Sequence, residues 1–343
     1  MNVRPYLQLT RLHTVPLETV PAILGATLAL GHFLDVQVLL WGVFGVLYHA
    51  AGYGMNSVED WRRGWDSDDP NKQHHPLNAG QMTLRSAAVF AYGLLALLVV
   101  YVVAIADGWV PVAVFLTGGP LAGTLYNTIG KETRGKYALI AYSHATVFAT
   151  PYLSLSDGSI PALFAGCAYV FVWVSFQTIS GEIKDITQDE ANLLLSLGSR
   201  VGERDGRPFV EFSRLAKLYA YGLRLLTVVI AVVLGALVTA RHGDVAAVPH
   251  LSEFGVGVTI LAVLAVGASS LVLTARLIGD GPFDRGERIA TMSKIEITSV
   301  LMMVLALVTV VGVGNAFLLV GGAVGWVVLF NKIEWDTLVA PEV

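Results

Sequence analysis

The chain reads LRSAAVFAYGLLALLVVYVVAIA at residues 84–106, a run with one charge and enough length to cross a bilayer as a helix. Similar apolar runs lie near residues 15–32, 36–55, 109–127, 137–155, 160–181, 218–240, 254–275, 296–313 and 316–331. Strands of a membrane barrel would instead alternate over about 10 residues, so a barrel is excluded. The sequence predicts an all-α, polytopic membrane bundle of about nine transmembrane helices, with the last run as a candidate tenth.

The composition places the whole chain in the membrane class. Apolar residues make up 55% of the 343 residues and charged residues only 14%, whereas a soluble domain carries about 25% charged residues. The mean hydropathy is +0.64. The single cysteine, Cys167, excludes an intramolecular disulfide and a CxxC metal site. We expect one membrane-embedded domain over residues 1–343, with the lipid bilayer as a partner, no nucleic acid and an open oligomeric state.

The basic residues orient the predicted bundle. On the side where the chain starts, the loops are 56–83, 128–136, 182–217, 276–295 and the C-terminal tail. Of the 22 Lys and Arg residues, only Arg241 falls in a loop of the opposite side. Basic loops face the cytoplasm, so the side of the chain start is predicted to be cytoplasmic. An acidic loop followed two helices later by a short basic loop occurs twice, which predicts two four-helix halves around a central cavity.

Two acidic clusters follow apolar runs on this cytoplasmic side. The first reads NSVEDWRRGWDSDD at residues 56–69, and the second reads GEIKDITQDE at residues 181–190. They open two predicted motif loops, 57–82 and 182–217. Carboxylates beside hydrocarbon are costly and mark functional sites by default. The clusters are therefore the candidate active site.

The spacing within each cluster gives its carboxylates a common direction. Asn56 and Asp60 are four residues apart, as are Asp185 and Asp189, so on a helix each pair shares one face. Asp66 follows after a glycine that lets the chain turn. Oxygen ligands of this kind suit Mg²⁺, which is bound through a few carboxylates together with a substrate phosphate. Clustered cysteines and an HExxH motif, which would indicate zinc, are lacking in the sequence.

Basic side chains accompany the acidic clusters on the same predicted side. They are Arg62, Arg63, Lys72, Lys131, Arg134 and Lys184. Carboxylates, magnesium and basic residues together match a diphosphate, because metal ions bridge its oxygens and Lys or Arg neutralise the charge that grows as it leaves. A simpler interpretation is that the acidic residues are solvated loop residues and that the basic residues reflect membrane topology alone. Two i, i+4 clusters at helix ends on one side of the membrane weigh against it.

At these residues the chain resembles the UbiA superfamily of intramembrane prenyltransferases. The resemblance rests on the pattern NxxxDxxxGxD at Asn56, Asp60 and Asp66, on KDITQD at residues 184–189, on HHPLNAG at residues 74–80, on the stretch from Tyr126 to Lys131, and on the opening RLHTVPLETVPAILGA. The first motif is most similar to that of members which prenylate dihydroxynaphthoate on the way to menaquinone. His75 stands where the family usually has Arg, and the insertion 199–214 is long for the family.

The resemblance implies ionisation of an allylic prenyl diphosphate by two Mg²⁺ ions, followed by capture of the prenyl cation by a lipophilic acceptor. Under it, Asp60 and Asp185 are catalytic, and the metal ligands are Asn56, Asp60, Asp66, Asp185 and Asp189. The substrate-binding residues that we predict are Arg63, Lys72, Tyr126, Lys131, Arg134, Lys184 and His49. An aromatic quinone precursor is the expected acceptor. Alternative acceptors are a glycerophosphate lipid and a carotenoid. An alternative reaction is that of a terpene cyclase, which needs no external acceptor.

Two alternative hypotheses assign the same residues to other classes of protein. A cation-coupled transporter would place its charges near the membrane midplane on broken helices, whereas here they lie at helix ends. A scaffold without an active site predicts that replacing Asp60 or Asp185 has no effect. Among single residues, Glu18 near the start of the first span is expected to orient an acceptor or to lie at the interface. His144 within the fifth span is a functional hypothesis, and Arg224 is expected to reach the headgroups by snorkelling.

Overall fold

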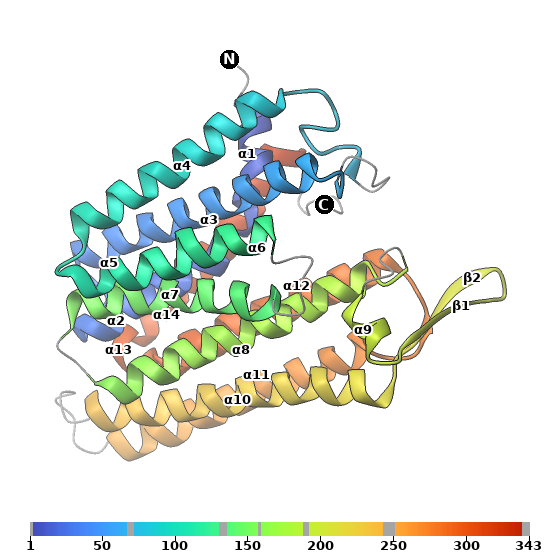
Figure 1. Ribbon diagram of the computed structural model, residues 1–343. Helices are drawn as coiled ribbons and strands as arrows, with labels where there is room; N and C mark the ends of the chain where they lie inside the picture. The colour runs from blue at the N-terminus through green and yellow to red at the C-terminus, as the bar shows by residue number, and fades with distance from the viewer. Residues whose placement is uncertain are drawn as a thin grey trace. The chain divides into compact units, whose positions relative to one another are not determined.

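A computed structural model describes residues 3–66, 72–129, 136–156, 159–187, 192–242 and 251–337. Helices make up most of this part of the chain (Figure 1). Eight of its helices are long and apolar enough to cross a membrane. The prediction of an all-α membrane bundle is confirmed. The chain divides into two compact units, Met1–Cys167 with Val310–Val343, and Ala168–Thr309.

The first unit contains both ends of the chain. Its elements are α1 (Arg4–Thr10), η1 (Leu12–Thr14), α2 (Pro16–Leu30), α3 (Val36–Arg62), α4 (Leu84–Ile105), α5 (Trp109–Leu116), the π-helical segment η3 (Thr117–Gly123), α6 (Thr124–Thr128), α7 (Lys136–Leu155) and α14 (Val313–Trp335). Helix α3 packs against α2 and α4, and α2 packs against α7. Buried aromatic side chains of α3 and α5, Trp41, Phe44, Tyr48 and Phe115, fill the space around them.

Small residues set the spacing of α2, α3 and α7. A Cβ atom on Gly45 of α3 would lie 2.6 Å from the Cα of Thr19 on α2. A Cβ atom on Gly25 of α2 would collide with the carbonyl group of Phe148 on α7. Lipid tails are as apolar as leucine, so membrane helices associate through close packing and polar contacts rather than the hydrophobic effect. These glycines therefore fix which side chains of the three helices meet.

The described residues of the second unit form four long helices and a small sheet. Its elements are α8 (Ile160–Lys184), which starts in the first unit, α9 (Leu193–Ser196), β1 (Arg200–Arg204), β2 (Arg207–Glu211), α10 (Arg214–His242), α11 (Leu251–Leu277), β3 (Gly281–Pro282) and α12 (Arg285–Ala306). The short α13 (Val308–Val311) follows α12. Helix α10 packs against α11 and α12, and α11 packs against α12.

The three-stranded antiparallel sheet was not anticipated from the sequence, which predicts only a charged, glycine-rich insertion there. Strands β1 and β2 form a hairpin that turns at Asp205 and Gly206, whose φ angles are 56° and 72°. Asp-Gly is a favoured pair for such a two-residue turn because both positions need positive φ. Strand β2 also pairs with β3, which joins the insertion to the loop between α11 and α12.

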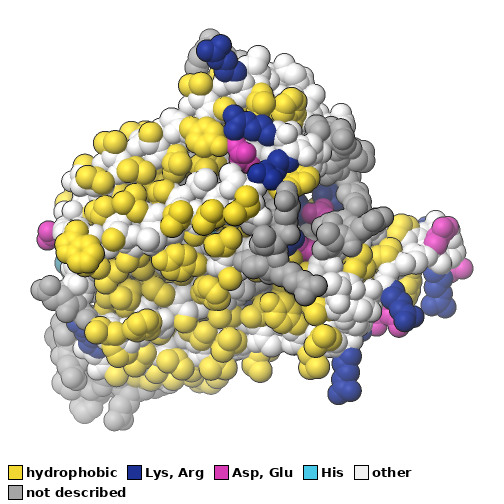
Figure 2. Space-filling view, viewed as in Figure 1, with side chains coloured by type: hydrophobic (Ala, Val, Ile, Leu, Met, Phe, Trp, Pro, Cys, Tyr) yellow, Lys and Arg dark blue, Asp and Glu magenta, His cyan; other side chains and the backbone are white. Residues whose placement is uncertain are grey.

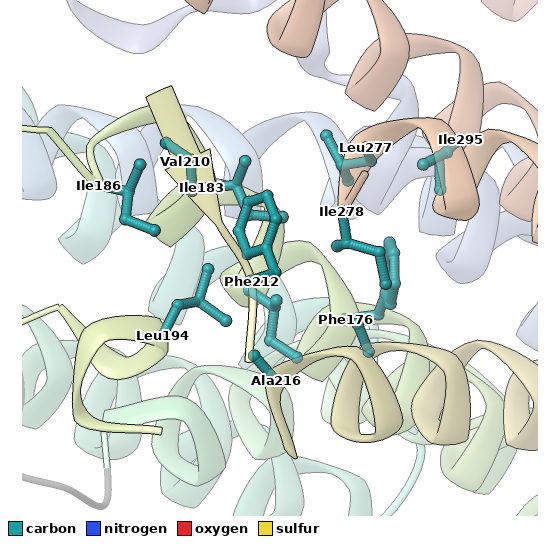
Figure 3. Packing of buried hydrophobic residues seen from close by; sticks show 12 residues of the cluster. Phe176, Ile183, Ile186, Leu194, Val210, Phe212, Ala216, Leu277, Ile278 and Ile295 are labelled. Carbon is teal, nitrogen blue, oxygen red and sulfur yellow. The ribbon is translucent and has the colours of Figure 1, made fainter. Parts of the chain in front are cut away.

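An apolar cluster anchors the C-terminal end of α8 in the second unit (Figure 3). Ile183 and Ile186 are buried in it beside Leu194 and Phe212, which come from α9 and from the segment after β2. Because these two isoleucines face the cluster, the chain between them is fixed at the helix end. The position of Asp185 is thus set by its buried neighbours.

The surface of the long helices is apolar. Figure 2 shows hydrophobic side chains along their flanks and charged ones gathered toward helix ends and the β1–β2 hairpin. Exposed fractions of 65% for Val100 and 68% for Leu261 illustrate this on α4 and α11. Without lipid such exposure would be unfavourable, so these flanks face hydrocarbon.

The snorkelling expected of Arg224 is wrong. Its side chain is fully buried within the second unit and donates hydrogen bonds to Ser270, to Ser299 at 2.8 Å and to Thr298 at 3.1 Å. These hydroxyls belong to α11 and α12. The guanidinium therefore ties α10 to its two neighbours inside the bundle instead of reaching the headgroups.

Candidate active site

The first acidic cluster lies on the last two turns of α3. The helix continues past the apolar run to Arg62, because the polar residues after Met55 still complete its backbone hydrogen bonds. The Asn56 amide donates to the Asp60 carboxylate at 2.9 Å, as their spacing predicts. Asp60 is buried, with an exposed fraction of 5%. The amide thus fixes the orientation of a carboxylate that has little contact with water.

A tight turn after α3 brings back the third predicted ligand. Gly64 has φ of +77°, a conformation that favours glycine, and it redirects the chain. Asp66 follows and is buried. The Asn78 side-chain amide donates to the backbone carbonyl of Asp66 at 2.8 Å and to that of Lys72 at 2.9 Å. This amide holds the two ends of the segment together.

Lys72 forms an ion pair with one oxygen of the Asp66 carboxylate. The other oxygen, Oδ2, is buried and has no hydrogen-bond partner among the described residues. Burial raises the pKa of Asp66, but the Lys72 ammonium outweighs it, and the net effect holds that pKa below its ordinary value. The carboxylate therefore stays ionised. A buried, ionised oxygen without a partner is a place for a cation.

His75 lies fully buried near the same segment. Neither of its ring nitrogens has a hydrogen-bond partner in the described part of the chain. Burial, and then the positive charge of Arg11, lower the pKa of His75 to about 4. The imidazole is therefore neutral at pH 7. At this position the chain offers a neutral donor and acceptor instead of the guanidinium that the resemblance leads one to expect.

Other charged side chains at the end of α3 have structural partners. Arg62 pairs with Glu59 at 2.7 Å, and the Tyr92 hydroxyl of α4 donates to the same carboxylate at 2.6 Å. Arg63 is exposed, and its guanidinium lies 5.3 Å from the centre of the Trp65 ring. Glu59 thus joins α3 to α4, whereas Arg63 remains accessible from solvent.

The second acidic cluster lies at the end of α8. The Asp185 carboxylate is 3.5 Å from Arg285 and 4.0 Å from Lys184, and its side chain is 38% exposed. Glu182 accepts from the backbone N–H of Leu193 at 2.8 Å, so it holds the start of α9 in place. Lys184 thus lies beside Asp185, as predicted.

Arg285, which contacts Asp185, is a candidate site residue that the sequence did not predict. It lies in the basic segment 276–294, which served only to indicate topology. The predicted residues Lys131, Arg134 and Asp189 lie outside the described residues. Tyr126 is half-buried on α6, an element that packs against α3.

The donors of the first cluster fit magnesium. They are hard oxygens from Asn56, Asp60 and Asp66, and one of them, Asp66 Oδ2, is buried without a partner among the described residues. Within the described ranges, three or more His, Cys, Asp and Glu residues do not come together as a metal cage. Hard oxygens of this kind suit Mg²⁺, which keeps waters and takes phosphate oxygens to complete its coordination.

Residues 19–278 match the UbiA prenyltransferase family. The chain belongs to this family. It is 25% identical over 211 residues to a digeranylgeranylglyceryl phosphate synthase of Saccharolobus solfataricus, covering 59% of this chain and 70% of the relative. The enzyme class predicted from the motifs, a prenyltransferase, is confirmed.

Solved structures agree with the fold of this UbiA prenyltransferase. A UbiA homologue from Archaeoglobus fulgidus bound to GPP and Mg²⁺ superposes with a TM-score of 0.59 at 17% identity, over 89% of this chain and 99% of the other. The apo structure of a homologue from Aeropyrum pernix K1 gives 0.59 at 13% identity, over 92% and 98%. The structure of a digeranylgeranylglyceryl phosphate synthase gives 0.57 at 16% identity, over 94% and 98%.

The UbiA prenyltransferase fold also brings together three residues that the sequence singled out separately. Glu18 of α2, His49 of α3 and His144 of α7 are in contact. His49 was predicted to bind substrate, but its side chain is fully buried against Glu18. The sequence signal for this network was present in the three intramembrane ionisable residues, but their association depends on how the helices pack.

Proposed function

We propose that this enzyme transfers a prenyl group from an allylic prenyl diphosphate to a lipophilic acceptor in the cell membrane, with Mg²⁺ and with its active site facing the cytoplasm. The observation that carries the proposal is the buried carboxylate of Asp66. It keeps one oxygen without a partner among the described residues, in the motif that contains the fixed Asn56–Asp60 pair. The asymmetry of Lys and Arg along the sequence supports the cytoplasmic side.

Each of the two clusters would hold one metal ion. Asn56, Asp60 and Asp66 would hold one Mg²⁺, and Asp185 with Asp189 a second. When bound, Mg²⁺ would neutralise the negative charge that grows on the diphosphate as the bond between the diphosphate and the prenyl carbon breaks.

The chain contributes orientation and charge around the metal ligands. The Asn56 amide holds Asp60, and Lys72 holds Asp66 ionised with one oxygen left for a cation. The candidates to bind the phosphate groups are Arg63, Lys131, Arg134, Lys184 and Arg285. The Archaeoglobus fulgidus homologues bound to GPP or DMAPP with Mg²⁺ support a prenyl diphosphate and Mg²⁺ as the ligands.

We infer that the acceptor is an aromatic quinone precursor, because the first motif has the glycine-containing spacing that resembles members of that type. A second candidate is a glyceryl phosphate lipid, which the Saccharolobus solfataricus relative favours by its name. Both acceptors are lipophilic and carry a hydroxyl group. They differ in whether an aromatic ring or a phosphate identifies them to the enzyme.

The test is to incubate the purified protein with prenyl diphosphates of several lengths, Mg²⁺, and either a dihydroxynaphthoate or a prenylated glyceryl phosphate, and to identify the products by mass. We expect Mg²⁺-dependent release of diphosphate coupled to one prenylated product. Asp60→Asn should abolish it, while Asp35→Asn, at the opposite end of the same helix, should not. If diphosphate release does not require Mg²⁺, or if Asp60→Asn keeps full activity, the proposal is wrong.

A further inference from the structure

A carboxylate is buried between two histidines inside the first unit. Glu18 of α2 has an exposed fraction of 2%. Its Oε2 lies 2.6 Å from Nδ1 of His49 on α3, and its Oε1 lies 3.0 Å from Nε2 of His144 on α7. We call these three residues the Glu18 network. None of these residues belongs to the acidic clusters. An ionisable group buried within a membrane bundle is costly and is by default a candidate functional group.

The outer nitrogen of each imidazole carries a proton. Nε2 of His49 lies 3.0 Å from the carbonyl oxygen of Arg11, and Nδ1 of His144 lies 2.9 Å from that of Ile140. A carbonyl oxygen only accepts hydrogen bonds, so both nitrogens donate. A neutral imidazole has one N–H, and therefore the inner nitrogen of each ring presents a lone pair toward Glu18 unless a further proton is added.

The Glu18 network consequently has a vacant place for a proton. Each inner contact joins a nitrogen lone pair to a carboxylate oxygen, and each needs one proton to become a hydrogen bond. With both protons present the network has a net charge of plus one. With one proton present it is neutral, and the second contact lacks its proton.

The neutral state is favoured inside the bundle because an uncompensated charge there is costly. The neighbouring ionisable groups point the same way. The Arg11 guanidinium lies 5.5 Å from the centre of the Tyr53 ring, and that ring is 4.4 Å from the ring of His49. Its positive charge opposes a second positive charge on the network. Tyr48, the other titratable side chain beside Glu18 and His144, is neutral and donates to the carbonyl of Ser143 at 2.8 Å.

One member of the network, His49, lies on the same face of α3 as the predicted metal ligands. His49, Tyr53, Asn56 and Asp60 follow at spacings of four, three and four residues, which keeps them on one face. His49 is seven residues from Asn56, or about 10 Å deeper along the helix. Of the network, His144 is the accessible member, with 16% of its side chain exposed. An acceptor beside the network would therefore meet it through His144.

We propose that the Glu18 network takes the proton that the acceptor loses during prenyl transfer, a role that rests on the proposed function. The bond between the prenyl carbon and the diphosphate oxygen breaks, and its electron pair leaves with the diphosphate. The acceptor forms its new bond to the prenyl carbon and releases a proton to His144, which fills the vacant contact with Glu18. His144 is then the catalytic residue, and Glu18 and His49 are positioning residues that act through it. The substrate class is an acceptor that loses a proton on transfer, such as a hydroxyl group or a hydroxylated ring.

The test separates proton removal from ionisation of the diphosphate. Glu18→Gln preserves the size of the side chain but removes the negative charge that stabilises a proton on His144. Purified enzyme with Mg²⁺ and a prenyl diphosphate is assayed for diphosphate release without acceptor and for product formation with the acceptor identified above. We expect Glu18→Gln to keep diphosphate release within about twofold and to lose 10²- to 10⁴-fold in transfer, the usual contribution of a positioned base. The low-pH limb of the transfer rate should disappear with it.

His144→Gln makes the same test at the accessible end of the network and remains informative if Glu18→Gln does not fold. Tyr48→Phe is the matched control, because it removes a buried hydrogen bond from the residue next to His49 while keeping the ring that packs against His144. If diphosphate release and transfer fall together in the variants, or if transfer persists unchanged, the network is structural and the inference is wrong. A wild-type enzyme that releases no diphosphate would instead refute the proposed function.

Discussion

Replacing Asn56 by Leu removes the amide that fixes the Asp60 carboxylate while keeping a side chain of similar size on α3. The hydrogen bond is 2.9 Å long, and its acceptor is a carboxylate that is only 5% exposed. A hydrogen bond to a charged group contributes about 1.5–3 kcal/mol. If this energy serves to hold Asp60 in its metal-binding orientation, Mg²⁺-dependent turnover should fall roughly 10- to 150-fold, since about 1.4 kcal/mol is a factor of ten.

The assay is initial diphosphate release at a series of Mg²⁺ concentrations with saturating prenyl diphosphate. We expect the Mg²⁺ requirement of Asn56→Leu to rise and excess Mg²⁺ to restore part of the rate, because the carboxylate is still present. Asn315→Leu is the matched control. Its amide also donates to a residue four positions away, the carbonyl of Val311 at 2.9 Å, at the start of α14, a helix that holds none of the predicted site residues. A normal Mg²⁺ dependence in Asn56→Leu would refute the role given to the amide.

Two further predictions concern stability. The buried Glu334 carboxylate accepts from the His13 backbone N–H at 3.1 Å and from its ring at 2.7 Å. Glu334→Ala should destabilise the protein by about 1–3 kcal/mol for each donor left unsatisfied, and thermal unfolding in detergent measures it, with Glu334→Gln as the milder control. In the second unit, partial burial opposes ionisation of Asp280, but hydrogen bonds from Lys217 and the Phe212 N–H prevail and lower its pKa. Its contribution to stability is therefore present above its ordinary pKa of about 4 and lost as the pH falls through the lowered value. Asp280→Asn should flatten this part of the stability curve, and an unchanged curve would exclude the contact as its source.

The helices could be predicted from the sequence because lipid imposes one rule on every residue of a span. The run 84–106 became α4, Leu84–Ile105, almost unchanged. The run 36–55 became a helix that ends at Arg62, because hydrogen bonding within the backbone does not stop where apolar residues stop. Gly64 with its positive φ was the better marker of that end. The Asp205–Gly206 pair likewise predicts a hairpin turn, although the charged residues around it are not typical of strands.

The side-chain network around Glu18 was beyond sequence reasoning for a different reason. Its members come from three helices, and His144 is far from Glu18 along the chain. Their meeting depends on the register of α2 against α3 and α7, which close contacts at Gly25 and Gly45 determine. Residue type alone identified each ionisable group as unusual, but only packing shows which groups lie within hydrogen-bond distance of one another.

Two buried ionisable groups in this bundle illustrate how hydrogen bonding separates structure from function. Arg224 donates from each of its three nitrogens to a hydroxyl oxygen of Ser270, Ser299 or Thr298, so every contact has a proton and an acceptor. These contacts need no further proton, and they hold the helices together. Glu18 has two contacts at hydrogen-bond distance and, in the neutral state, one proton for both. A buried group whose hydrogen bonds are complete favours rigidity, whereas one that lacks a single proton is suited to receive it. Of these two, only Glu18 contacts, through His49, the face of α3 that leads to Asp60.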